Sequence, residues 1–212
     1  MVEGQQEDGR RARRERNRAA IIDAMFGLVQ DGKVPPSVDD VAARAGVSVS
    51  SVFRNFDGLA DLQHRALESF QARYSHLLVV DDAARPRAER IRSHVERRVE
   101  LYEAAGALMR VGRARALDHE PMVQGIASIR ARLAAQTTAR FSEELTALTP
   151  VESANLSALI DATTSPEAYE VLGAAHARTP RQIRKLWTSA LDAVLGAWAG
   201  DDSFPNEGGT SG

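Results

Sequence analysis

Histidines are the side chains in this sequence best suited to acid–base or metal chemistry, and their spacing supports neither. They are scattered along the chain at His64, His76, His94, His119 and His176. No two stand four residues apart, the spacing that puts two metal ligands on one helix face. The polar cluster at 118–120 is made of neighbours, whose side chains diverge on a helix. Without cysteine, a glycine-rich phosphate loop or a nucleophile elbow, we expect no enzyme, metal or cofactor.

Arginines near the N-terminus have a chemistry suited to phosphate. Six of them lie within nine residues, offset there only by Glu15: Arg10, Arg11, Arg13, Arg14, Arg16 and Arg18. The whole chain carries a formal net charge of -2, but the local charge sets the field that a DNA backbone meets. We expect residues 1–12 to be a disordered arm that becomes ordered on DNA.

The stretch 37–56, SVDDVAARAGVSVSSVFRNF, predicts two short helices joined by a tight turn. Ser37 is a helix cap with Asp40 three residues on, and apolar residues at 38, 41, 42 and 45 share one face of a helix over 38–45. Gly46 suits the left-handed end of that helix, and Ser48 caps a second helix over 49–55. This is a helix-turn-helix, whose second helix enters the DNA major groove.

The second of these helices carries small hydroxyls and one cation for reading DNA. Serine hydroxyls can bond base edges or phosphates, and Val49 can pack on a thymine methyl. Arg54 is either a phosphate clamp or a base reader. The predicted DNA contacts are Arg14, Arg18, Ser37, Ser48, Val49, Ser50, Ser51, Phe53, Arg54 and Asn55.

The pattern Val41-Ala42-x-x-Ala45-Gly46-Val47-Ser48, followed by Ser51-Val52-Phe53-x-x-Phe56, resembles the DNA-binding signature of TetR-type transcriptional regulators. The resemblance implies a dimeric, all-helical, cytoplasmic regulator that releases DNA when a small ligand binds its C-terminal domain. It also implies that Phe53 and Asn55 approach the DNA backbone. Phe53 lacks the hydroxyl of a tyrosine. Leu59 stands where the family usually has a phosphate-binding lysine, so we expect Arg14 and Arg18 to supply the missing charge.

The rest of the chain predicts an all-α fold, since no stretch alternates as a strand does. We expect a helix-turn-helix domain over 13–62, a helical effector-binding and dimerisation domain over 63–199, and a disordered tail over 200–212. A helix over 13–30 precedes the pair already described. The further expected helices are 57–77, 86 to about 105, 107–117, 121–148, and three that open on a capped proline at 150, 166 and 180.

The second domain should hold the effector site. Aromatic and methionine side chains at helix-interior spacing are the candidate lining: Tyr74, Tyr102, Met109, Met122 and Phe141. Each is also an ordinary core residue by type. Pockets are mostly apolar, so we expect a small hydrophobic effector. Arg110, Arg113 and Arg115, with His119, form either a cationic site or a solvated helix face.

The last two long helices are rich in large apolar residues, beyond what one neighbour should bury. Aromatic anchors of this type concentrate in interface cores. The predicted dimer contacts are Leu156, Leu159, Ile160, Trp187, Leu191, Val194, Leu195 and Trp198.

Taken together, the sequence predicts a ligand-responsive repressor that binds a near-palindromic, double-stranded operator as a homodimer. No apolar run approaches the roughly 18 residues of a membrane helix, so we expect a cytoplasmic protein without a membrane partner. The alternative is a DNA-binding regulator or architectural protein with no small-molecule effector.

Overall fold

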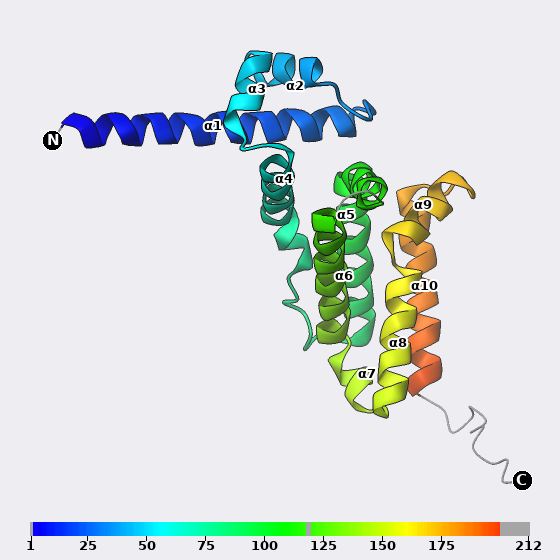
Figure 1. Cartoon of the computed structure of the whole chain (residues 1–212). Coiled ribbons are helices and arrows are strands. Elements are labelled where there is room, and N and C mark those ends of the chain that lie inside the picture. The colour runs from blue at the N-terminus through cyan, green and yellow to red at the C-terminus, as the bar shows by residue number, and fades with distance from the viewer. Residues whose placement is uncertain (1, 118–119, 200–212) are drawn as a thin grey trace, which may run out of the picture. The chain divides into compact units, whose positions relative to one another are not determined.

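The computed structural model describes residues 2–117 and 120–199, and each regular element among them is a helix (Figure 1). The all-α prediction is therefore confirmed. The predicted tail at 200–212 lies outside the described residues. The elements are α1 (Val2–Gln30), α2 (Val38–Ala45), α3 (Val49–Asn55), α4 (Leu59–Tyr74), the 3-10 helix η1 (Ser75–Leu78), α5 (Arg87–Ala116), α6 (Glu120–Arg140), α7 (Ser142–Thr146), α8 (Pro150–Thr163), α9 (Pro166–Ala174) and α10 (Pro180–Ala199).

These helices pack into two compact units. Unit 1 takes the chain up to Leu78 together with 101–132, and unit 2 takes 79–100 together with the chain from Leu133 on. Helices α5 and α6 contribute residues to both units. The predicted division at residues 62 and 63 falls inside α4, all of which belongs to unit 1.

The two helices predicted at 38–45 and 49–55 are present with those bounds. The Ser37 hydroxyl accepts a hydrogen bond from the Asp40 amide at 3.1 Å, and the Ser48 hydroxyl accepts one from the Ser51 amide at 3.2 Å. Gly46 has φ 66°, a left-handed conformation that glycine adopts without a steric penalty. Local cap chemistry thus fixes where α2 ends and α3 begins.

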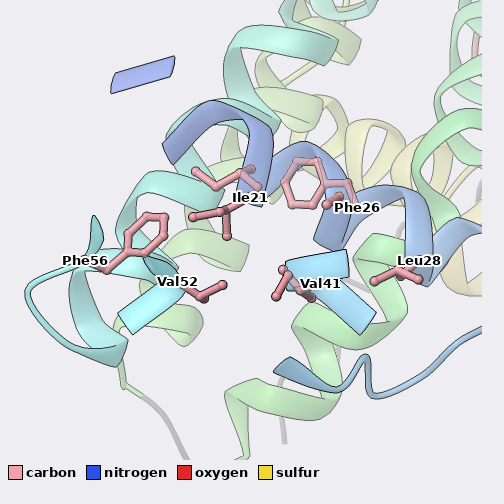
Figure 2. Packing of buried hydrophobic residues seen from close by; sticks show 9 residues of the cluster. Ile21, Phe26, Leu28, Val41, Val52 and Phe56 are labelled. Carbon is pink, nitrogen blue, oxygen red and sulfur yellow. The ribbon is translucent and has the colours of Figure 1, made fainter. Parts of the chain in front are cut away.

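An apolar core holds these helices on α1, as Figure 2 shows. The C-terminal half of α1 contributes Ile21, Ile22, Ala24, Phe26 and Leu28, and α2, α3 and the residue after α3 contribute Val41, Ala42, Val52 and Phe56. Because α3 has only seven residues, about two turns, it cannot be stable alone. Its orientation therefore depends on this packing and on the polar contacts at its ends.

Helix α1 begins at Val2, so the described residues 2–12, predicted as a disordered arm, form its first turns in this structure. This segment contains no proline. Acidic residues precede the arginines in sequence, an order that complements the helix dipole and favours i,i+4 pairs. In Figure 1 the N-terminal half of α1 projects beyond α2 and α3.

Two other predicted helix boundaries are wrong. Gly106 does not end α5, which runs unbroken to Ala116, because one interior glycine costs only about 1 kcal/mol and tertiary packing offsets it. The helix predicted over 121–148 breaks at Phe141, which has φ -107° and ψ 24°. The Arg90 guanidinium bonds the Arg140 carbonyl at 3.0 Å and also the Glu144 carboxylate, contacts that stabilise the break.

The three hydroxyl-proline starts are confirmed. Thr149 and Glu152 form a complete capping box at α8, and the Ser165 hydroxyl accepts from the Ala168 amide at 3.0 Å at α9. At α10 the Thr179 hydroxyl accepts from the Gln182 amide at 3.3 Å. Within the described residues, no helix is both long and apolar enough to cross a membrane.

Candidate nucleic-acid interface

One side of α3 is fully turned to solvent and carries both apolar and polar chemistry. Val49, Ser50, Phe53 and Arg54 follow helical spacing along this side, which we name the α3 outer face. Phe53 is 66% exposed and Val49 is 38% exposed. Exposed apolar surface beside Ser50 and Arg54, on a helix that is anchored by its opposite side, makes the α3 outer face a candidate binding surface.

The opposite side of α3 faces the core. Val52 and Asn55 are buried, and Ser51 is half-buried. The Asn55 side-chain amide donates to the Ser51 carbonyl at 2.7 Å, one turn back in the same helix. The prediction that Asn55 contacts DNA is therefore wrong for its side chain, because an i,i+4 contact and burial occupy it.

The serines at the start of α3 form a small hydroxyl cluster. The Ser48 hydroxyl lies 3.1 Å from that of Ser50 and 2.8 Å from that of Ser51. Ser48 and Ser50 are exposed, so they keep free hydrogen-bonding capacity toward a ligand. Ser37, exposed at the start of α2, is committed to its cap and also donates to the Asp40 carboxylate at 2.9 Å.

Arg54 is the cation of the α3 outer face. Its guanidinium donates to the Ser50 carbonyl at 3.3 Å and to the Ser51 hydroxyl at 3.4 Å, both within the same helix. No carboxylate of the described residues lies within ion-pair distance of it. Its positive charge is therefore available to a phosphate or a base edge.

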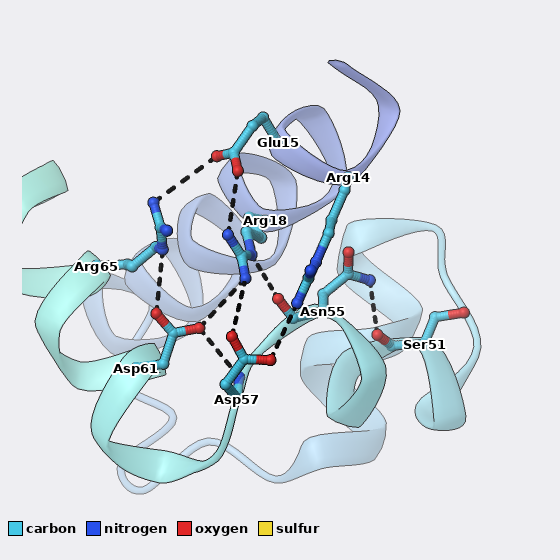
Figure 3. Close-up of polar contacts among 8 residues, drawn as sticks. All are labelled: Arg14, Glu15, Arg18, Ser51, Asn55, Asp57, Asp61 and Arg65. Carbon is cyan, nitrogen blue, oxygen red and sulfur yellow. Dashed lines mark hydrogen bonds and ion pairs between the residues drawn. The ribbon is translucent and has the colours of Figure 1, made fainter. Parts of the chain in front are cut away.

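Arg18, in contrast, is buried in an ion network where α1 meets the junction between α3 and α4 (Figure 3). Its side chain is 7% exposed. Its guanidinium donates to the Asn55 carbonyl at 2.5 Å, to Glu15 at 3.1 Å and to Asp61 at 3.4 Å. The prediction that Arg18 contacts DNA is wrong, because its donors and its exposure are used inside the chain.

Arg14 is tied to the same network. It pairs with Asp57 at 3.1 Å, although both side chains remain partly in solvent. Arg65 completes the set by pairing with Asp61 at 3.2 Å. Three cations (Arg14, Arg18, Arg65) thus face three anions (Glu15, Asp57, Asp61), and the network adds no net charge to the interface.

Three other arginines of α1 keep their charge. Arg11, Arg13 and Arg16 are exposed, and none is paired with a carboxylate of the described residues. They lie in the N-terminal half of α1. The sequence-based prediction treated all six arginines as one basic arm. The acidic residues Asp57 and Asp61, the latter paired with Arg65 at i,i+4, were the sign that some of these arginines form ion pairs within the chain.

The start of α4 is occupied by its own carboxylate. Asp61 accepts from the Asp57 amide at 3.1 Å, and this hydrogen bond, with those from Arg65 and the charge of Arg18, lowers the pKa of Asp61. Gly58 has φ 103°, a conformation that favours glycine, which fixes the turn from α3 into α4. The side chain of Leu59, predicted to leave a phosphate contact missing, lies outside the described residues.

The five predicted effector residues do not share one unit. Tyr74, Tyr102, Met109 and Met122 belong to unit 1, whereas Phe141 is fully buried in unit 2, with its ring centroid 5.3 Å from that of His94. Tyr74 donates its hydroxyl to the Ala104 carbonyl at 3.2 Å. Arg110 and Arg115 are exposed and Arg113 is half-buried, while His119 lies outside the described residues.

Most of the predicted dimer contacts are buried within a single chain. Trp187 is 2% exposed and packs near Tyr169 of α9, with ring centroids 6.1 Å apart. The others that are fully buried are Leu156, Ile160, Leu191 and Leu195. The prediction is wrong for these five, because α10 packs on both α8 and α9 and needs their apolar surface for the core. Leu159 is exposed, and Val194 and Trp198 are half-buried.

Unit 2 also contains a buried polar seam that sequence reasoning missed. Arg90, His94 and Arg98 stand one turn apart along α5, and Arg90 and Arg98 donate to the α6 carbonyls of Arg140 and Leu133 at 3.0 and 2.8 Å. The i,i+4,i+8 spacing of these basic residues was the available signal. Polar residues at that spacing more often form a solvated face, so the sequence alone does not show that these three are buried.

Helices α2 and α3 with the turn at Gly46 form a helix-turn-helix, and the α3 outer face is its candidate DNA-binding surface. No family model and no curated protein matches the sequence. Solved structures do match: a transcriptional regulator from Rhodococcus sp. Rha1 superposes with a TM-score of 0.62 at 20% identity, covering 89% of this chain and 98% of that one. A TetR transcription regulator from Haloarcula marismortui ATCC 43049 gives 0.58 at 15% identity, covering 85% and 97%. The chain therefore has the fold of these regulators, and the predicted resemblance to the TetR type is confirmed at the level of fold.

Proposed function

We propose that this protein is a TetR-type transcriptional regulator that binds a near-palindromic operator as a homodimer and represses transcription until a small effector releases it. The observation that carries the proposal is the α3 outer face: a seven-residue helix, anchored by Val52 and Asn55, that presents Phe53 and Arg54 to solvent. A helix held in this way enters the major groove as a rigid reading element.

The chemistry of this face suits both base and backbone contacts. Val49 and Phe53 offer apolar surface to thymine methyl groups or sugars, and Ser50 offers a hydroxyl to a base edge or phosphate. Arg54 offers an unneutralised guanidinium that can bond guanine or phosphate. Sequence choice is then carried by α3, with one cation per recognition helix.

Affinity for the DNA backbone needs further positive charge, and we assign it to α1. Arg11, Arg13 and Arg16 are exposed and free of ion pairs with described residues, whereas Arg14 is partly neutralised by Asp57. Each phosphate contact that they make releases counterions, so binding should weaken steeply with salt.

Dimerisation is proposed through exposed stripes on α8 and α10. On α8 the exposed residues at helical spacing are Val151, Asn155, Ala158, Leu159 and Ala162, and on α10 they are Leu186, Ser189, Ala193 and Ala197. Leu159 and Leu186 are 43% and 47% exposed. Mostly small residues with two leucines let helices from two copies approach closely. Two recognition helices would then read half-sites about 34–36 Å apart, or a multiple of it.

For the effector, a surface cavity in unit 2 of about 420 Å³ is the candidate site. Leu148, Leu156 and Trp198 supply an apolar wall, and Arg90 and Glu144 supply charge. An effector with a hydrophobic body and one polar end fits this lining. Its binding should quench the fluorescence of Trp198, and W198F should lose the response while W187F keeps it. An effector acts only if it binds the DNA-free and DNA-bound states with different affinity.

The DNA-binding proposal is tested by selection from a random duplex library with the purified full chain. We expect one enriched half-site, repeated in inverted orientation about one helical turn apart. F53A and R54A should each lower affinity for the selected duplex at least tenfold, whereas R92A, which removes an exposed arginine of α5 in unit 2, should not. Binding without an enriched sequence would favour the architectural alternative, and wild-type affinity in both α3 variants would refute the assignment of the interface.

A further inference from the structure

We propose that Arg18 is a positioning residue: it fixes the pose of the recognition helix against α1 and α4, and so sets operator affinity and discrimination without touching DNA. The proposal rests on the DNA-binding function above. It concerns the junction of residues 55–58, where α3 ends and α4 begins. The Arg18 side chain of α1 contacts both sides of this junction (Figure 3).

The guanidinium contacts consecutive residues of the junction. It donates to the Asn55 carbonyl at 2.5 Å, lies 5.9 Å from the centre of the Phe56 ring, and is 3.9 Å from the Asp57 carboxylate. It also reaches Asp61 in the first turn of α4 at 3.4 Å. A single rigid group therefore ties the last residue of α3 to the start of α4.

The end of α3 needs such a partner. The last carbonyls of a helix have no bonding partner inside the helix, and α3 lacks the left-handed glycine that commonly satisfies them. Its C-cap residue Phe56 is extended, with φ -124° and ψ 142°. The Asn55 carbonyl instead accepts a hydrogen bond from the Arg18 guanidinium, which supplies the capping hydrogen bond at the C-terminal end of the recognition helix.

Arginine suits this role better than lysine. Its planar fork presents separate N–H donors in fixed directions, and here Nε, Nη1 and Nη2 bond Asn55, Glu15 and Asp61 respectively. A lysine has one nitrogen and could keep one or two of these bonds. R18K is therefore expected to preserve part of the function.

The charge pattern separates positioning from phosphate binding. Because the network is neutral overall and Arg18 is 7% exposed, Arg18 has no donor left for a direct contact with DNA, although its loss would leave the network with one excess negative charge. A phosphate contact lowers affinity for all DNA when it is lost and reduces the salt slope by about 1 per contact. A positioning contact lowers affinity only for the sequence that needs the correct pose.

The experiment measures binding of wild type, R18A and R18K to the selected operator and to a scrambled duplex across a salt series. We expect R18A to lose at least tenfold more affinity for the operator than for the scrambled duplex, because the uncompensated carboxylate that it leaves weakens binding to both duplexes alike. R18K, which keeps the charge, should recover the operator affinity only in part. R13A and R16A are the matched controls, expected to reduce the slope for both duplexes. Equal losses on both duplexes with a lower slope for R18A would make Arg18 a phosphate contact and overturn the proposal, as would unchanged operator binding.

A second measurement needs no DNA. Amide hydrogen exchange at residues 55–61 of the free protein should accelerate in R18A, and less so in D61N, which weakens one of the Arg18 contacts while its amide oxygen can still accept from the Asp57 amide. D61N also guards against a misfolded R18A, since it should lose operator affinity in the same direction. Unchanged exchange in both variants would refute the positioning role. If wild type binds no DNA, the proposed function fails, and this measurement still tests the Arg18 contacts.

Discussion

Lowering the pH should reduce the free energy of unfolding, because His94 is buried in surroundings that disfavour its protonated form. His94 is fully buried in unit 2. Its Nε2 lies 3.1 Å from the Thr164 hydroxyl, which donates its own proton to the Ile160 carbonyl at 2.9 Å. Nε2 is therefore the donor and carries the proton, and Nδ1 is unprotonated and has no partner among the described residues.

Protonating this ring in the folded state is unfavourable. Burial comes first among the causes that hold the pKa of His94 well below its ordinary value, followed by repulsion from Arg98 on α5 and Arg140 on α6. The unfolded chain, with a histidine pKa of about 6.5, then binds the extra proton first as pH falls. The stability contributed by neutral His94 is fully present above that pH and is lost below it.

The expected loss of unfolding free energy between pH 7.5 and 5.5 is at most about 1.4 kcal/mol, since one full unit below the unfolded pKa is worth about 1.4 kcal/mol. Urea unfolding at both pH values, at fixed protein concentration, measures it. H94Q is the reference, because glutamine can still donate to Thr164 but does not titrate. Every other titratable group is common to the two proteins, so the difference between them reports His94 alone. A pH dependence in H94Q equal to that of wild type would refute the reasoning.

Three further predictions follow from burial and backbone geometry. G46A should destabilise the protein by about 1–2 kcal/mol, because Gly46 has φ 66°, a left-handed conformation that is strained for alanine. An added methyl group would meet no neighbouring atom, so the loss of stability seen in thermal unfolding reports backbone strain alone. W187A should cost about 3–5 kcal/mol in urea unfolding, since Trp187 is 2% exposed. L159E with L186E should convert the proposed dimer to a folded monomer by sedimentation, and a dimer at wild-type affinity would place the interface elsewhere.

Local signals in the sequence predicted the local structure well. Ser37, Gly46 and Ser48 set the bounds of α2 and the start of α3, because a cap is a contact between residues a few positions apart. The proline-led starts of α8, α9 and α10 were predictable for the same reason. The exposed side of α3 also followed in part, since Val49, Ser50 and Arg54 lie where helical spacing put them.

Errors arose where the outcome depends on partners far away in sequence. Whether Arg18 faces DNA or the fold is decided by Asp61, 43 residues on. Trp187 was predicted to be an interface residue because the sequence does not reveal that α9 packs against α10 and buries it. Gly106 was read as a break because its intrinsic helix propensity is poor, and packing along α5 outweighed that preference.

The continuity of α5 and α6 limits how this protein can be re-engineered. The chain passes between the two units at 78/79, 100/101 and 132/133, and the last two passages lie inside unbroken helices. A chimaera that joins residues 1–62 to the sensing part of another protein would leave out 101–132, whose Ala104 carbonyl accepts from the Gln30 side chain at 2.8 Å. A new specificity is therefore better grafted residue by residue onto the α3 outer face than exchanged as a block.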